Sequence, residues 1–421
     1  MIFENEENKD YVEKCRKGQC RSCGRSGLTP VLDLGHMPLS DGLLKESQLT
    51  ETEEKYPLEV AFCPQCTLVQ ILETVPPEKL FCEDYPYYSS FSDALLAHSR
   101  ENVLSLIEKR KLGSDSLVIE PASNDGYLLK NYVEKGIPVL GIDPAEGPAQ
   151  AAEKIGVNTL CDFFTVNLAE QLVDEGRKAD VIHANNVLAH VADTNGFVKG
   201  IHTLLKNNGV AVIEVPYVRD LIDHCEFDTI YHEHLCYFSV TALDHLFRRH
   251  NLFLNDMKQL AIHGGSLRLF IEPRENVLDS VQRLLTEEAD SGLDNFKYYE
   301  KFSLKVLEIR RAMQELISHI KADGKRIAAY GAAAKGTIML NYIGVGPDVI
   351  DFVVDRNIHK QGKYMPGMHI PICDPIRLME EMPDYVLILP WNFKDEILSQ
   401  QAAFRQQGGK FIIPIPQPEI I

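Results

Sequence analysis

The sequence predicts an α/β protein in which two Rossmann-like domains follow a small N-terminal domain built around four cysteines. Closely spaced cysteine pairs occur in the first fifth of the chain, and short apolar strands alternate with helix-like stretches through most of the rest. At 421 residues the chain exceeds what one hydrophobic core usually supports. Two or three domains are therefore expected.

Composition and charge narrow the classes of function. A hydrophobic share of 45% and a charged share of 25% are those of an ordinary globular protein. A formal net charge of -18 argues against a general nucleic-acid or anionic-membrane surface. No apolar run approaches the roughly 18 residues of a membrane span, and residues 1–10 are acidic, unlike a signal peptide. We expect a cytoplasmic monomer or homodimer that binds neither nucleic acid nor membrane.

Two C-x2-C pairs, Cys20 with Cys23 and Cys63 with Cys66, predict a metal site. Each pair can present two thiolates to one ion, and four thiolates complete a closed tetrahedral zinc site. Such a site leaves no position for a reactive water, so the zinc is expected to be structural. Cys15 is an alternative ligand with a less suitable spacing, and two unrelated reduced pairs are the other alternative. We expect this zinc-binding domain to span residues 1–83.

A tyrosine-rich segment follows, with Tyr85, Tyr87 and Tyr88 around a proline. Three such side chains cannot all face one core, so at least one hydroxyl is expected to face solvent or a ligand. Packing between domains is the alternative.

A βαβ unit is expected next. Residues 117–120 form a strand-like run that enters the small-residue loop 121–127, and a second strand, residues 138–142, ends at Asp143. Ligands bind at the carboxyl ends of such strands, where an acidic side chain can hold both hydroxyls of a ribose. The loop lacks the G-x-G-x-x-G pattern of nicotinamide-dependent dehydrogenases.

Residues 231–239, with the sequence YHEHLCYFS, form a dense group of titratable and polar side chains. Imidazole titrates near neutrality, and a carboxylate can fix its tautomer. Two histidines that flank Glu233 therefore predict a proton-transfer site, with ordinary loop polar residues as the alternative.

Downstream, residues 261–271 read as a strand with a glycine-rich entry. Arg268 on this strand can face a phosphate or carboxylate, or can lie on the surface beside a hairpin turn. Residues 274–323 carry apolar residues at regular spacing among charges, which predicts long amphipathic helices that bridge domains. A coiled-coil partner site is the alternative.

The last hundred residues repeat the α/β pattern. A strand at residues 326–330 opens into a small-residue loop and a helix, with Lys335 nearby, and a later strand ends at Asp355. A small-residue loop at a helix N-terminus beside a lysine is typical of pyrophosphate sites. The alternative is a domain that serves only as a scaffold.

These motifs together resemble a known family. Residues 120–126, Asp143, residues 185–190 and the strand before Pro216 resemble the core of class I S-adenosylmethionine-dependent methyltransferases. With the four cysteines, the tyrosine-rich segment and the Tyr-x-Glu-His-x-x-Tyr-Phe-Ser loop, essentially the whole chain resembles C-methyltransferases that act on nucleotide-linked keto-deoxysugars. The resemblance implies an S-adenosylmethionine-binding domain at residues 84–256 and a nucleotide-sugar-binding α/β domain at residues 257–421, with a helical linker at about 274–323.

One departure concerns Ala122, where this family usually has glycine. A small residue lets the backbone approach the cofactor, but a requirement for positive φ would disfavour alanine.

The implied chemistry is methylation of the carbon next to a ketone in a nucleotide-linked 4-keto-deoxyhexose. A general base forms an enolate there, and hydrogen-bond donors stabilise its oxygen in a pocket that excludes water. The resemblance makes His234 the expected base, with Tyr231 and Glu233 as supports and His190 as a second candidate near the reacting centre.

The resemblance also implies two sets of ligand-binding residues. The expected cofactor-binding residues are Glu120, Ala122, Asn124, Gly126, Asp143, Pro144, Asp162, Phe163, Asn185 and Asn186. The expected substrate-binding residues are Tyr85, Tyr88, Tyr237, His263, Gly265, Arg268, Gly331, Ala333, Lys335, Asp355 and Lys360. Two other interpretations remain at this point: an N- or O-methyltransferase of another small molecule, and a non-enzymatic assembly protein that contains zinc.

Overall fold

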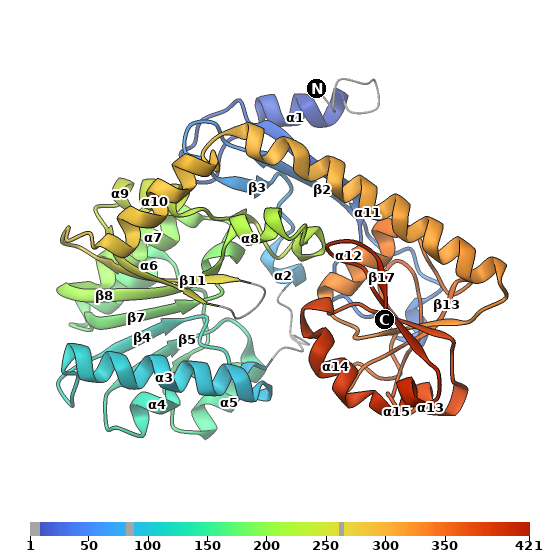
Figure 1. Cartoon of the computed structure of the whole chain (residues 1–421). Coiled ribbons are helices and arrows are strands. Elements are labelled where there is room, and N and C mark those ends of the chain that lie inside the picture. Colours follow the sequence, from blue (N-terminus) through green and yellow to red (C-terminus); the bar gives the residue numbers. More distant parts are fainter. Residues whose placement is uncertain (1–8, 81–87, 261–264) are drawn as a thin grey trace.

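The computed structural model describes residues 9–80, 88–260 and 265–421, and the described residues form three β-sheets flanked by helices (Figure 1). The first sheet is antiparallel, with the order β1-β2-β3-β9. Its last strand comes from the middle of the chain, so the segment that carries His234 is joined to the N-terminal domain. The elements of this domain are α1 (Lys9–Lys17), β1 (Thr29–Met37), β2 (Tyr56–Phe62), β3 (Val69–Ile71), α2 (Pro77–Leu80) and β9 (Cys236–Tyr237).

The central sheet has seven strands in the order β10-β11-β8-β7-β4-β5-β6. Six of them run in the same direction, while β11 runs antiparallel to its neighbours β8 and β10. All four residues of β4 are buried, as expected for a parallel strand that is covered on both faces. The strands are β4 (Val118–Pro121), β5 (Val139–Ile142), β6 (Thr159–Leu160), β7 (Ala179–Asn185), β8 (Leu205–Pro216), β10 (Phe253–Leu260) and β11 (Ser266–Glu272).

This strand order is that of class I methyltransferases. It reverses direction between β4 and β7, and a ligand crevice is expected at the carboxyl ends of these two strands. The boundary expected at residue 256 falls inside β10, and the sheet continues through β11. The helices of this domain are α3 (Asp93–Arg110), α4 (Lys130–Val133), α5 (Glu146–Lys154), α6 (Val166–Asp174), α7 (Thr194–Leu204), α8 (Val218–Asp223) and α9 (Val240–Arg249).

The C-terminal sheet has the order β14-β13-β12-β15-β16-β17, with β17 antiparallel to its neighbour. This is a second Rossmann-like order, and its reversal lies between β12 and β15. Its strands are β12 (Ile327–Tyr330), β13 (Ile350–Val354), β14 (Ile372–Cys373), β15 (Tyr385–Ile388), β16 (Lys410–Ile413) and β17 (Glu419–Ile420). Its helices are α12 (Ala334–Ile343), α13 (Arg377–Glu381), α14 (Lys394–Gln400) and α15 (Ala402–Gln406).

Two helices, α10 (Asp279–Ser291) and α11 (Phe296–Ala322), connect the two Rossmann-like domains. In Figure 1, α11 runs along the top of the molecule from the central domain to the C-terminal one. Its buried residues recur every three or four positions, and its Tyr299 ring packs 5.0 Å from the Phe62 ring of β2, measured between centroids. Both helices lie within residues 274–323, for which the sequence predicts long amphipathic helices. None of the described helices is both long and apolar enough to cross a membrane.

Candidate functional site

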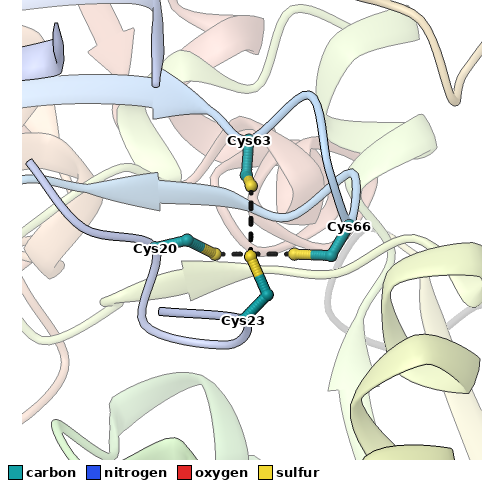
Figure 2. A group of neighbouring side chains, drawn as sticks. All are labelled: Cys20, Cys23, Cys63 and Cys66. Atoms are coloured by element: carbon teal, nitrogen blue, oxygen red, sulfur yellow. Dashed lines mark hydrogen bonds between the residues drawn. The ribbon is translucent and has the colours of Figure 1, made fainter. Parts of the chain in front are cut away.

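The four predicted cysteine ligands converge in the N-terminal domain (Figure 2). Their sulfur atoms all lie within 4.8 Å of one another, with Cys20 Sγ 3.5 Å from Cys66 Sγ and Cys23 Sγ 3.6 Å from Cys63 Sγ. A zinc ion with Zn–S bonds of about 2.3 Å fits a group of this size. Three of the four side chains are buried, and four thiolates complete the tetrahedral coordination of zinc, so zinc has a structural role here.

The loop after β4 stands where the strand order reverses and a ligand crevice is expected. Ala122 and Asn124 adopt left-handed φ values of 57° and 49°. The backbone N–H of Asn124 donates to Asp143 Oδ2 at 2.8 Å, and that of Ala145 donates to Oδ1 at 2.9 Å. Each carboxylate oxygen retains a second lone pair that a ribose hydroxyl can use. Burial raises the pKa of Asp143, although these two N–H groups act to lower it.

Several buried acceptors in this crevice have no hydrogen-bond partner among the described residues, namely Glu120 Oε2, Asp125 Oδ1 and Asn185 Oδ1. Burial raises the pKa of Glu120, and the nearby carboxylates of Asp143 and Asp125 raise it further. S-adenosylmethionine carries an ammonium group, a sulfonium group and two ribose hydroxyls, and an acidic, acceptor-rich crevice fits these groups.

The remaining expected cofactor residues lie around the same edge of the sheet. Gly126 has a φ of 75°, and a Cβ there would come within 3.0 to 3.2 Å of Val157 and Ala152. Asp162 and Phe163 are exposed just after β6. Asn186, at a φ of 53°, donates its backbone N–H to the Glu214 carbonyl at 2.8 Å. Pro144 separates Asp143 from Ala145.

His234 is oriented by a backbone carbonyl. Its Nδ1 lies 2.8 Å from the carbonyl oxygen of Thr229, which ends the short 3-10 helix η5 (Phe227–Thr229). Because a carbonyl oxygen can only accept, the imidazole must donate from Nδ1. In the neutral ring Nε2 then carries the lone pair of a base.

Three aromatic side chains surround this imidazole. The ring centroid of Tyr231 lies 4.0 Å from that of His234, His190 lies 4.7 Å away, and Tyr237 lies 6.5 Å away. Burial lowers the pKa of His190 to about 4, so His190 is neutral near pH 7. The structure therefore brings together His190, Tyr231, His234 and Tyr237.

The other two members of the histidine-glutamate motif contact the N-terminal domain. Glu233 Oε2 accepts a hydrogen bond from Ser40 Oγ at 3.1 Å, and the Ser40 carbonyl accepts one from Thr337 Oγ1 at 2.8 Å. Burial and the nearby Asp41 raise the pKa of Glu233 to about 7. His232 is fully buried, with Nε2 3.1 Å from the Pro57 carbonyl oxygen. His232 therefore ties the loop to β2.

The C-terminal crevice repeats the loop geometry with cationic side chains. Ala332 donates its backbone N–H to Asp355 Oδ2 at 2.7 Å, and Lys360 Nζ donates to the Ala332 carbonyl at 2.7 Å. Lys335 Nζ donates to Asn392 Oδ1 at 3.0 Å. Gly331 has a φ of 91°, and Ala333 is the N-cap of α12. Two lysines at a helix N-terminus suit an anion.

Arg268 is not available as expected. It is 6% exposed and its Nε donates to Glu214 Oε1 at 2.6 Å on the neighbouring strand β8, with Nη2 2.8 Å from His98 Nε2. The expected contact with substrate is replaced by a buried ion pair, because β11 inserts beside β8 and places the two side chains opposite each other.

Of four further expected substrate residues, two are described by the structure. The hydroxyl of Tyr88 lies against Gly147 of α5, on the cofactor side, since a Cβ on Gly147 would sit 2.8 Å from it. Gly265 has a φ of 127°, and a Cβ there would meet Asp220 Oδ2 at 2.0 Å, so this close approach requires glycine. Tyr85 and His263 lie outside the described residues.

Sequence reasoning missed Thr229, Asp228 and Ser40. Asp228 and Ser40 bond to residues from distant segments, whereas Thr229 lies in the same loop as His234 and acts through its backbone carbonyl. The Thr229 carbonyl has no side-chain signature. Trp391, whose indole N–H donates to Asp228 Oδ2, was indicated by the sequence, because it is the one tryptophan of the chain and stands at the carboxyl end of a predicted strand.

The central sheet has the class I order and its crevice fits S-adenosylmethionine, so the protein is an S-adenosylmethionine-dependent methyltransferase. Family models match in three parts: a zinc binding domain at residues 20–81, a methyltransferase domain at residues 94–254, and a C-methyltransferase C-terminal domain at residues 261–416. The chain is 34% identical over 406 residues to the C-methyltransferase NovU of Streptomyces niveus, which covers 96% of each protein. The chain therefore belongs to the C-methyltransferase family of NovU.

Two further proteins match only part of the chain. A ubiquinone biosynthesis O-methyltransferase from Bartonella quintana is 29% identical over 97 residues, which cover 23% of this chain and 39% of that protein. The solved structure of magnesium protoporphyrin IX methyltransferase (ChlM) from Synechocystis PCC 6803 with bound SAH covers 42% of this chain and 82% of its own, at 13% identity and a TM-score of 0.34.

Proposed function

We propose that this C-methyltransferase acts on a nucleotide-linked 4-keto-deoxyhexose, and that it methylates the carbon next to the ketone by way of an enolate. The observation that carries the proposal is the hydrogen bond from His234 Nδ1 to the Thr229 carbonyl, because it gives Nε2 the lone pair of a base. The family of NovU supports the C-methyl transfer itself.

In this mechanism His234 Nε2 takes the proton from the carbon next to the ketone, and the C–H electron pair moves into the enolate. The positive charge then formed on the imidazole is stabilised by the Nδ1–H bond to Thr229. S-adenosylmethionine, when bound, supplies an electrophilic methyl group for the enolate carbon. No metal is needed for this step, which agrees with the closed zinc site.

The neighbours of His234 have roles that fit their environment. Tyr231, whose ring packs against the imidazole, can donate its hydroxyl hydrogen to the enolate oxygen. His190 remains neutral because burial lowers its pKa to about 4, so it can donate a hydrogen bond without carrying a competing charge. Both residues are catalytic in this proposal.

The C-terminal crevice is assigned to the diphosphate of the nucleotide. Lys335 and Lys360 flank the N-terminus of α12, and both the helix dipole and the lysine charges favour an anion there. This half would hold the nucleotide while the sugar reaches the base.

The substrate is tested by incubating the protein with 4-keto-6-deoxy nucleotide sugars and a labelled methyl donor, then locating the label. We expect the label on a ring carbon next to the ketone, and solvent deuterium should exchange into that position. Label on nitrogen or oxygen, without exchange, would instead establish an N- or O-methyltransferase.

The base is tested by His234→Gln. We expect turnover to fall by about 10²- to 10⁴-fold, the usual contribution of general base catalysis. Affinity for S-adenosylhomocysteine, measured by calorimetry, should stay unchanged, because His234 lies outside the central crevice loop. Near-normal turnover in this variant would remove His234 as the base.

A further inference from the structure

We infer that Trp391 is a positioning residue that aims His234 through Asp228 and the Thr229 carbonyl, so that the C-terminal domain sets the orientation of the base. The inference rests on the proposed role of His234. It concerns two hydrogen bonds, one from Trp391 to Asp228 that joins the C-terminal domain to η5, and one from His234 to the Thr229 carbonyl within the loop.

All three residues of η5 make contacts that matter for this inference. The Phe227 ring packs 5.1 Å from the Tyr342 ring of α12, measured between centroids. Asp228 Oδ2 accepts a hydrogen bond from Trp391 Nε1 at 2.8 Å. The Thr229 carbonyl accepts the bond from His234 Nδ1 at 2.8 Å. The C-terminal domain thus holds the first two residues of the turn whose third residue orients the base.

The bond between Trp391 and Asp228 is buried and hard to replace. Asp228 is 0% exposed, and its second oxygen, Oδ1, has no hydrogen-bond partner among the described residues. Burial raises the pKa of Asp228 to about 6, although Lys335 and the indole N–H act to lower it. Loss of the indole N–H would leave a buried carboxyl group without that donor, and the turn would have to move to regain one.

Trp391 also faces the anion crevice. It follows β15 at the point where the strand order reverses, and Lys335 Nζ lies 4.6 Å from the centroid of its ring. Lys335 bonds to the next residue, Asn392. The indole therefore contacts both the lysine of the C-terminal crevice and the carboxylate of the turn that holds His234. Because η5 is one short turn, a displaced Asp228 moves the Thr229 carbonyl with it.

The test is a double-mutant cycle on Trp391→Phe and Asp228→Ala, with Asp228→Asn as the conservative variant. We expect each of the first two to lower kcat by about 10- to 100-fold, the cost of misplacing a reacting group by about an ångström. The double variant should lose no more than either single one, because both changes break the same bond. Asp228→Asn should keep most of the turnover, since an amide oxygen can still accept from the indole.

Two readouts separate positioning from a general loss of structure. Solvent deuterium exchange into the substrate, with S-adenosylhomocysteine in place of the methyl donor, should slow in proportion to kcat, while KM and S-adenosylhomocysteine affinity stay constant. The control is Tyr298→Phe, which removes a solvent-exposed hydrogen bond from α11 to Asp223 of α8 and leaves the Trp391–Asp228 and His234–Thr229 bonds untouched. It should leave the exchange rate unchanged.

Wild-type exchange in Trp391→Phe, or losses that simply add in the double variant, would overturn the inference. These outcomes are distinct from failure of the proposed base. In that case His234→Gln would retain turnover, whatever the two positioning variants do.

Discussion

The central and C-terminal Rossmann-like domains share one local device. In each, a backbone N–H of the loop after the first strand donates to the aspartate that ends the second strand, from Asn124 to Asp143 and from Ala332 to Asp355. Both loops lie where the strand order reverses. The fold therefore builds the same kind of crevice twice within one chain.

The two crevices differ in charge. The central one is lined by carboxyl groups, including Glu120, Asp125 and Asp143, whereas Lys335 and Lys360 flank the C-terminal one. The comparison teaches that topology sets where a ligand binds, and that a few side chains set which ligand it is. A cationic cofactor suits the first crevice, and an anionic nucleotide is our proposal for the second.

Among the substitutions that test the likeness of the two loops, Gly331→Ala should have the largest effect on stability. A Cβ at Gly331 would lie 2.4 Å from Pro390 Cδ, on a backbone with a φ of 91°. Overpacking and left-handed strain together should destabilise the protein by about 2–4 kcal/mol. Thermal unfolding measures the loss of stability. An unchanged melting temperature would contradict the prediction, because it would show that the C-terminal loop accommodates a Cβ at position 331.

A charge comparison should give the next largest effect. Asp143→Asn should weaken S-adenosylhomocysteine binding by about tenfold, since it removes a charged acceptor of ribose hydroxyls. Lys335→Gln should instead weaken binding of the nucleotide-sugar substrate and leave S-adenosylhomocysteine binding unchanged. Calorimetry measures the binding of both ligands to each variant. Weaker nucleotide-sugar binding in Asp143→Asn, or weaker S-adenosylhomocysteine binding in Lys335→Gln, would contradict the division of ligands between the crevices.

A pH comparison sharpens the difference in charge. Burial raises the folded-state pKa of Glu120, with Asp143 and Asp125 adding to it, so the folded protein holds a proton that the unfolded chain releases near pH 4.3. Stability is therefore lost as pH rises through the window between those two pKa values. The melting temperature without cofactor should fall less steeply with pH in Glu120→Gln than in the wild type.

The matched control is Glu146→Gln, at an exposed position on α5. It should keep the wild-type pH slope. Equal slopes in Glu120→Gln and the wild type would show that the central crevice carries no such titration.

The parts of the molecule that were predictable have local signals. The two C-x2-C pairs identify four cysteines that do converge. Asp143 and Asp355, each at the end of a predicted strand, indicate where the two crevices are expected. Long-range pairing is different in kind. Nothing near Arg268 indicates that Glu214 will lie opposite it, and this depends on β11 inserting beside β8.

The histidine loop shows the same limit. Its density of polar groups indicates proton transfer, but it does not reveal that Thr229 rather than Glu233 bonds to His234 Nδ1, or that Glu233 bonds to Ser40. A backbone carbonyl looks the same at every position of a sequence. The partner of a buried carboxylate is set by how the domains pack, which no local pattern records.

The smallest effect is expected from Ala122→Gly, the counterpart of Gly331→Ala in the other half. Ala122 occupies a positive φ of 57°. Its backbone N–H donates to the Ile142 carbonyl at 2.7 Å, which holds the loop in this conformation. The left-handed conformation destabilises alanine by about 1 kcal/mol, and glycine loses about as much stability through its greater chain entropy in the unfolded state. The change in unfolding free energy should therefore stay within about 1 kcal/mol, with S-adenosylhomocysteine affinity unchanged. A larger change would mean that the alanine methyl group itself shapes the central crevice.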